Sequence, residues 1–208
     1  MNAQLSYLQV RVYGTDGATR LFTQNDPELA SRTLVKLNPA KLFAADLVSL
    51  PTGDSDTTLA ASALARIDLV TDQLSVWDYP FVLGAQVELT ESEFRECLDY
   101  PQPWESLAGQ SDIPVFLQLT MVNGQRYFFW MEVAGGLSAM RMSRIQLMLK
   151  DPRLIFGLRE GGVGILNLTH LAHFTIYPEP PDATDEAQPN LGQLMAAAAI
   201  KPLRLQIR

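Results

Sequence analysis

The sequence has little cysteine and no long hydrophobic run. A single Cys, Cys97, stands among 208 residues, so no intrachain disulfide can form and nothing points to an oxidising compartment. No window approaches 18 uninterrupted apolar residues, which excludes a helical membrane span. The stretch from Met1 to Arg11 lacks a basic flank followed by an apolar core, so no secretory signal is expected. These absences together predict a cytoplasmic protein.

Catalytic and cofactor motifs are missing as well. The glycine-rich stretch 161–164 lacks the Lys-Ser/Thr pair that completes a phosphate loop, and it reads better as a turn between strands. His170 and His173 stand three apart in an apparent strand, on opposite faces and with no third metal ligand nearby. No nucleophile elbow and no credible Ser/His/Asp order is found. The sequence therefore predicts a non-enzymatic protein without metal or cofactor.

Charge is unevenly distributed along the chain. The net charge is −7, with 47% hydrophobic and 19% charged residues, a composition typical of a globular protein. Residues 78–112 carry eight acidic side chains and one basic, whereas residues 115–178 carry six basic and three acidic. The net charge disfavours nucleic-acid binding, which depends on neutralising phosphates, but the basic segment keeps that possibility open.

An internal repeat is the main organising feature. The segment Leu64–Val70 reads like Leu171–Tyr177, 107 residues later, and the same offset aligns the turn dipeptides Asp16-Gly17 and Asn123-Gly124. We interpret the repeat as a duplication of about 65 residues, the size of a minimal domain. The two copies span residues 8–71 and 115–178.

Each copy is expected to form five short strands. Leu8 and Val10 alternate with polar residues as in a half-buried strand, and Asp-Gly or Asn-Gly favours a tight hairpin turn. Strands are predicted at 8–12, 19–23, 32–37, 42–50 and 64–70, and at 115–122, 125–131, 140–149, 154–158 and 171–177. Five strands joined by tight turns in so short a segment favour a small closed barrel, because closure removes the exposed edges.

This pattern resembles the SH3-like and Sm-like small barrels. It consists of a strand, a turn with Gly, a second strand, a third carrying a basic residue such as Arg141, a Pro-Phe element and a final hydrophobic strand. Bacterial chains of unassigned function with an Sm-like repeat are similar. The signature of RNA-binding Sm proteins is absent as such, and 139–142 resembles it only loosely. The resemblance implies a fold and a tendency to oligomerise, and it implies no reaction.

The remaining segments complete the predicted organisation. A capping box, Thr90 with Glu93, predicts a short helix at 91–99 in which Cys97 would be buried. An acidic, Pro-rich stretch from 178 to 189 reads as a linker, followed by an Ala-rich helix at 191–200 and an alternating C-terminal strand. The fold class is therefore mainly β with minor α: a first barrel at 1–76, a connector at 77–114, a second barrel at 115–178 and a helix–strand tail at 179–208.

Three functions are compatible with this organisation. The first is an assembly or adaptor protein whose partner is itself or another protein. Its alternating C-terminal strand, with Leu203, Leu205 and Ile207, would add either to the chain's own sheet or to that of a neighbouring subunit. The second is an Sm-like RNA binder, in which bases would stack on aromatic side chains beside basic ones. Its contact residues would be Arg141, Arg144, Arg153, Tyr127 and Trp130. The third is a domain that binds a small molecule in a cleft between the repeats.

Overall fold

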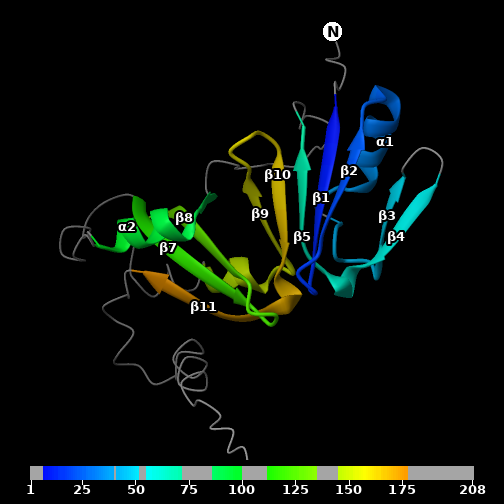
Figure 1. Ribbon diagram of the computed structural model, residues 1–208. Helices are drawn as coiled ribbons and strands as arrows, with labels where there is room; N and C mark the ends of the chain where they lie inside the picture. Colours follow the sequence, from blue (N-terminus) through cyan, green and yellow to red (C-terminus); the bar gives the residue numbers. More distant parts are fainter. Residues whose placement is uncertain are drawn as a thin grey trace, which may run out of the picture. The chain divides into compact units, whose positions relative to one another are not determined.

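The chain is mainly β and divides into two compact units (Figure 1). The computed structural model describes residues 7–39, 41–51, 55–71, 86–99, 112–134 and 145–177. Unit 1 comprises Met1–Glu88 and Ile145–His170, and unit 2 comprises Leu89–Arg144 and Leu171–Arg208. None of the helices in these described ranges is long and apolar enough to cross a membrane.

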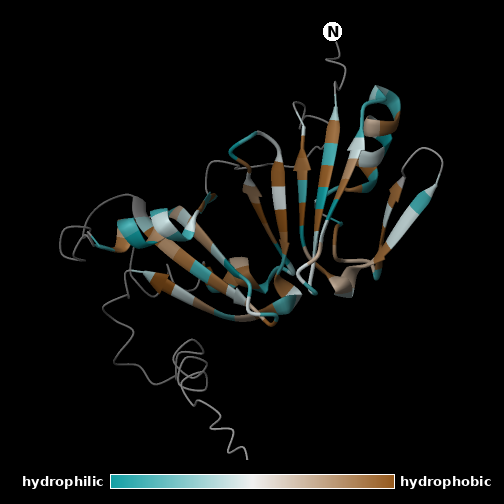
Figure 2. Ribbon diagram, viewed as in Figure 1, coloured by the Kyte–Doolittle hydropathy of each residue, from teal (hydrophilic) through white to brown (hydrophobic). Residues whose placement is uncertain are grey.

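Unit 1 is built on a mixed sheet with the strand order β6–β9–β10–β5–β1–β2. Its neighbours are antiparallel except for the parallel pair β6 and β9. The strands are β1 (Leu8–Gly14), β2 (Thr19–Gln24), β5 (Leu64–Val70), β6 (Gln86–Leu89), β9 (Arg153–Gly157) and β10 (Val163–Asn167). Figure 2 shows the alternation of hydrophobic and hydrophilic residues along β1, which buries every second side chain of that strand.

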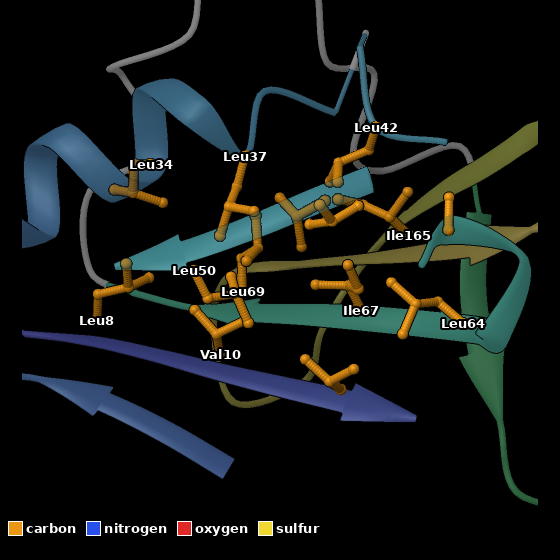
Figure 3. Packing of buried hydrophobic residues seen from close by; sticks show 14 of the residues in the cluster. Leu8, Val10, Leu34, Leu37, Leu42, Leu50, Leu64, Ile67, Leu69 and Ile165 are labelled. Carbon is orange, nitrogen blue, oxygen red and sulfur yellow. The ribbon is translucent and has the colours of Figure 1, made fainter. Parts of the chain in front are cut away.

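One face of this sheet is covered by a helix and a hairpin from the same unit. The helix is α1 (Pro27–Lys36), and the hairpin joins β3 (Leu47–Pro51) to β4 (Asp56–Ala60) in a separate two-stranded sheet. Leu34 of α1, Leu50 of β3 and Ile67 of β5 meet in one buried cluster (Figure 3). Each such side chain contributes about 1.5–3 kcal/mol by leaving water, so this core holds the three elements together.

The strand predicted at 32–37 is wrong, because this segment is the second half of α1. The Asp26 carboxylate accepts hydrogen bonds from the backbone N–H groups of Glu28 and Leu29, at 2.9 and 3.0 Å, and Pro27 occupies the start of the helix. A capping Asp and a Pro in the first turn both favour the start of a helix, and here they prevail over the alternation at 32–37. Residues 145–150 are likewise helical, where a strand at 140–149 was predicted. The other residues of that prediction, 140–144, lie outside the described ranges.

Unit 2 contains the antiparallel strands β7 (Asp112–Met121), β8 (Arg126–Ala134) and β11 (Leu171–Tyr177) in the order β11–β7–β8. Helix α2 (Glu91–Asp99) places Phe94 on this sheet. The ring centroid of Phe94 lies 6.2 Å from that of Phe116, 4.9 Å from that of Phe128 and 5.9 Å from that of Tyr177. These ring contacts pack α2 against the sheet, and each aromatic pair contributes about 0.5–1.5 kcal/mol beyond the burial of its area.

Helix α2 confirms the predicted connecting helix. The Glu93 carboxylate accepts a hydrogen bond from the backbone N–H of Thr90 at 2.8 Å, and the Thr90 hydroxyl accepts one from the Glu93 N–H at 3.3 Å. The prediction that Cys97 is buried is wrong, since its side chain is exposed. Phe94 alone is buried on this helix, so the apolar face is narrower than the spacing suggested.

Strand pairing repeats along the chain with the offset of 107. Val10 pairs with Phe22 between β1 and β2, and Leu117 pairs with Phe129 between β7 and β8. The registers of β1 with β5 and of β7 with β11 also correspond residue by residue. Both contain the same one-residue bulge, at Ala65 and at Ala172. Strand β4 and the short 3-10 helix η1 (Ala61–Ala63) recur in the same way as β10 and the short 3-10 helix η2 (Leu168–His170).

The described strands form open sheets, which corrects the prediction of two closed barrels. Neither strand order returns to its first member. The reason lies in the β9–β10 hairpin, which the sequence places in the second copy. Instead of closing on strands of its own copy, it pairs with β5 of the first, with Val163 opposite Leu69 and Ile165 opposite Ile67. The edge of β5 is thus occupied without barrel closure.

Candidate functional site

The pairing of β5 with β10 is the most completely buried part of unit 1. Every residue of both strands is buried. At the end of β10, the Asn167 side-chain amide donates hydrogen bonds to the carbonyl oxygens of Ala61 and Leu64, at 3.2 and 2.9 Å. The side-chain oxygen of Asn167, Oδ1, accepts a hydrogen bond from the Thr169 hydroxyl at 2.7 Å. Because these bonds tie η1 to η2, the joint is fixed at one end by a side chain as well as by the strand ladder.

An ion cluster lies on the face of β5 away from the core. Arg66 and Asp68 alternate with the core residue Ile67, so they point to the opposite side. The guanidinium of Arg66 donates to Asp68 from Nε at 2.6 Å and from Nη2 at 3.0 Å, and to Glu88 of β6 from Nη2 at 2.9 Å. Arg66 is 8% exposed and Asp68 1% exposed. This paired and hydrogen-bonded arrangement is the condition under which charges tolerate burial.

Aromatic rings enclose the guanidinium of Arg66. Its central carbon lies 4.9 Å from the ring centroid of Phe156 and 5.2 Å from that of Tyr13, a cation–π geometry. Gly164 makes room for Phe156, because a Cβ at position 164 would lie 2.3 Å from the ring. Burial by itself would lower the pKa of Arg66, but the hydrogen bonds that Arg66 donates to Glu88 and Asp68 outweigh this effect and raise its pKa. Arg66 therefore links β5, β6, β9 and β1 as a permanent cation.

A second, more exposed ion pair lies beside this cluster. Arg11 of β1 donates to the carboxylate of Glu160, in the turn between β9 and β10. The hydrogen bond from Arg11 is the main cause of the lowered pKa of Glu160. Burial raises the pKa of the neighbouring Tyr13 phenol, and the charge of Asp68 raises it further. All these groups have partners, so the cluster connects neighbouring strands of the sheet.

The residues predicted to contact RNA are divided between the two units and the residues outside the described ranges. Arg153 lies on β9 in unit 1, where it donates to Asp151 at 2.8 Å and to the carbonyl oxygen of Pro39 at 3.2 Å. Tyr127 and Trp130 lie on β8 in unit 2, both half-buried, and the neighbouring Phe128 and Phe129 are buried. Arg141 and Arg144 lie outside the described residues. The same is true of Leu203, Leu205 and Ile207, the predicted strand-addition edge.

Four strands, β2, β3, β4 and β11, have only one neighbour each among the described residues. Two of these, β4 and β11, have counterparts in the repeat, β10 and β5, that pair with each other. Strand β11 pairs with β7, and β4 pairs with β3. Every residue of β11 is half-buried, whereas every residue of β5, its counterpart in the repeat, is buried. Strand β4 alternates between exposed and half-buried residues, whereas its counterpart β10 is buried throughout. Strands β4 and β11 are thus less buried than their counterparts in the repeat, β10 and β5.

Unit 1 also contains a partly open pocket of about 250 Å³, lined by apolar and polar side chains of β1, β2, α1 and β3. Leu21, Phe22 and Leu50 contribute to its lining, together with Thr33. The Thr33 hydroxyl donates to the carbonyl oxygen of Leu29 at 2.8 Å, so it is already engaged within the helix. Within the described ranges no cluster of three or more His, Cys, Asp or Glu side chains could hold a metal ion.

Comparison with protein-family models, with curated proteins and with solved structures gives no match.

The ion cluster is the feature that sequence reasoning missed. Its signal is nevertheless visible, because Arg66 and Asp68 occupy alternate positions inside the apolar run Leu64–Val70. Two opposite charges two residues apart in a buried strand share one face, where each can satisfy the other.

Proposed function

We propose that this chain is a non-enzymatic assembly or adaptor protein, built from a duplicated β unit, that associates with itself. The observation that supports it best is the pairing of β10 with β5. One copy of the repeat there completes the sheet of the other through a strand edge, with four residue pairs in register. Because the two repeats join through a strand edge, each repeat contains a strand able to add to the edge of another sheet or an edge able to accept one.

The unpaired edges of β4 and β11 also support this proposal. A strand with an unpaired edge presents a row of N–H and C=O groups to any compatible strand. Strands β4 and β11 both have such an edge among the described residues. The cell compartment we propose is the cytoplasm, and the resemblance to Sm-like and SH3-like chains remains part of this proposal.

Light scattering coupled to size-exclusion chromatography tests the proposal. The full chain is measured over the range 1–100 μM, roughly the window of transient to stable association. We expect a mass above that of the 23.1 kDa monomer, increasing with concentration. A constant monomer mass across the whole range would contradict self-association.

A further inference from the structure

The repeat assigns a specific partner to the exposed edge of β11. The equivalent edge, that of β5, is occupied by β10. With the offset of 107, β10 corresponds to β4 and β5 corresponds to β11. We propose that β11 of one chain pairs antiparallel with β4 of a second copy of this chain. The proposal rests on the self-association proposed above and names the surfaces that carry it.

The register of this pairing follows from the observed one. Val163 lies opposite Leu69 and Gly164 opposite Asp68 in the buried joint. The offset transfers these pairs to Asp56 opposite Ile176 and Thr57 opposite Thr175. Two threonines facing each other across a strand pair are a favourable combination.

Charge and burial agree with this assignment. Strand β4 has β3 on one edge and no described neighbour on the other. On β4, Asp56, Thr58 and Ala60 are exposed while the alternate residues are half-buried, so a second strand could cover one face further. Strand β11 carries no Asp, Glu, Lys or Arg, so Asp56 meets no like charge on it. Pairing with β4 would give β11 the second neighbour that its counterpart β5 has.

The joint is directional, and this predicts the kind of assembly. If the two repeats of one chain were joined with two-fold symmetry, β10 would pair with β5 and β4 would pair with β11 in the same chain. The described strands contain only the first pair, while β4 and β11 have one neighbour each. A donor and an acceptor therefore remain on every chain. Contacts between unlike surfaces of this kind are heterologous, and they build rings or open filaments.

Cysteine cross-linking between two chains tests the register. Thr57→Cys in one chain and Thr175→Cys in a tagged second chain, both in a Cys97→Ser background, are mixed and oxidised. Directly opposed strand residues have the Cα separation that a disulfide needs. We expect a disulfide-linked species containing one chain of each kind. The matched control, Thr57→Cys with His173→Cys, lies two residues out of register and should give at least about tenfold less.

A non-covalent arm uses the exposed face of β4. Thr58→Lys should weaken association at least about tenfold, because Thr58 would face Phe174 in the joint and a lysine there must lose water. Thr23→Lys, on the exposed face of β2, should leave association unchanged. Circular dichroism confirms that each variant is folded.

The outcomes separate this inference from the proposed function. If the wild-type chain associates but Thr57→Cys and Thr175→Cys do not cross-link, the assigned edge is wrong and self-association stands. A disulfide within one chain of the Thr57→Cys/Thr175→Cys double variant would show own-chain closure and overturn the second copy as partner. A Thr175→Cys/Leu205→Cys disulfide would show instead that the C-terminal segment occupies β11. A strict monomer overturns both proposals.

Discussion

Removing Arg66 should destabilise unit 1 more than removing one partner of an exposed ion pair. Arg66→Met takes away the guanidinium that donates two hydrogen bonds to Asp68, whose side chain is 1% exposed. The Asp68 carboxylate then stays buried without its counter-charge. Breaking a buried pair in this way costs about 3–5 kcal/mol, a large fraction of the 5–15 kcal/mol that stabilises a typical domain.

Urea unfolding followed by circular dichroism measures this loss, at one fixed protein concentration because association adds apparent stability. The matched control is Arg32→Met. Arg32 forms an i,i+4 pair with Glu28 on α1, with side chains 66% and 75% exposed, and its loss should cost less than about 0.5 kcal/mol.

The double variant Arg66→Met/Asp68→Leu isolates the cause. It leaves no charge buried on this face of β5, so it should be more stable than Arg66→Met alone. Asp68→Asn, which keeps Arg66 paired with Glu88, should fall between wild type and Arg66→Met. A loss below about 1 kcal/mol for Arg66→Met, or a double variant less stable than Arg66→Met, would refute the reasoning.

Three further outcomes are expected. Gly162→Ala should cost more than Gly17→Ala in urea unfolding. Both glycines have positive φ, which costs about 1–3 kcal/mol for another residue, but only at 162 would the new Cβ lie 2.1 Å from a β5 carbonyl oxygen; equal losses would contradict this. Tyr13 has a raised pKa, so its contribution to stability is complete below pH 10 and declines as the pH rises above it. Thermal unfolding between pH 8 and 11 should decline less in Tyr13→Phe than in wild type or in the exposed control Tyr7→Phe; identical slopes would count against the shift. Phe94→Ala should cost about 3–5 kcal/mol, because a fully buried ring with three aromatic neighbours is lost; a loss under about 1 kcal/mol would show that α2 is not held by Phe94.

Period-2 alternation and turn dipeptides were the reliable signals in this sequence. They place β1 and β2 correctly, since β1 alternates in burial and the Asp16-Gly17 turn before β2 has Gly17 at φ 83°. The same holds for Gly124, at φ 84°, between β7 and β8. Local chemistry determines these features, so a local reading can find them. Strand β5 was predicted from the repeat instead, and every one of its residues is buried.

The prediction was wrong where a helix start competed with apparent strand periodicity. Asp26 and Pro27 supply a cap and a first helical residue, and those two positions override the alternation read at 32–37. Strands β4 and β10 were missed because Asp56-Thr57-Thr58 is polar and Gly164 interrupts an apolar run. Only the tertiary partner Phe156, which needs the space at Gly164, explains that glycine.

The candidate site could not have been assembled from the sequence for a related reason. Arg66 and Asp68 are adjacent on one strand, but Glu88 reaches them from β6 and Phe156 from β9. These residues meet only because the β9–β10 hairpin pairs with one edge of β5. This pairing joins segments far apart in the sequence, and no periodicity within either segment specifies it.

The discontinuity of unit 1 also has a consequence for synthesis on the ribosome. Strand β5 emerges early, but β10, which covers its edge, ends at Asn167 and follows the whole of 89–144. Until then the newly made chain carries an apolar strand with a bare edge, the kind of surface that aggregates or recruits chaperones. A chain ending after its first copy would keep that edge exposed permanently. Within one chain, the second copy of the repeat therefore covers the strand edge that the first copy leaves exposed.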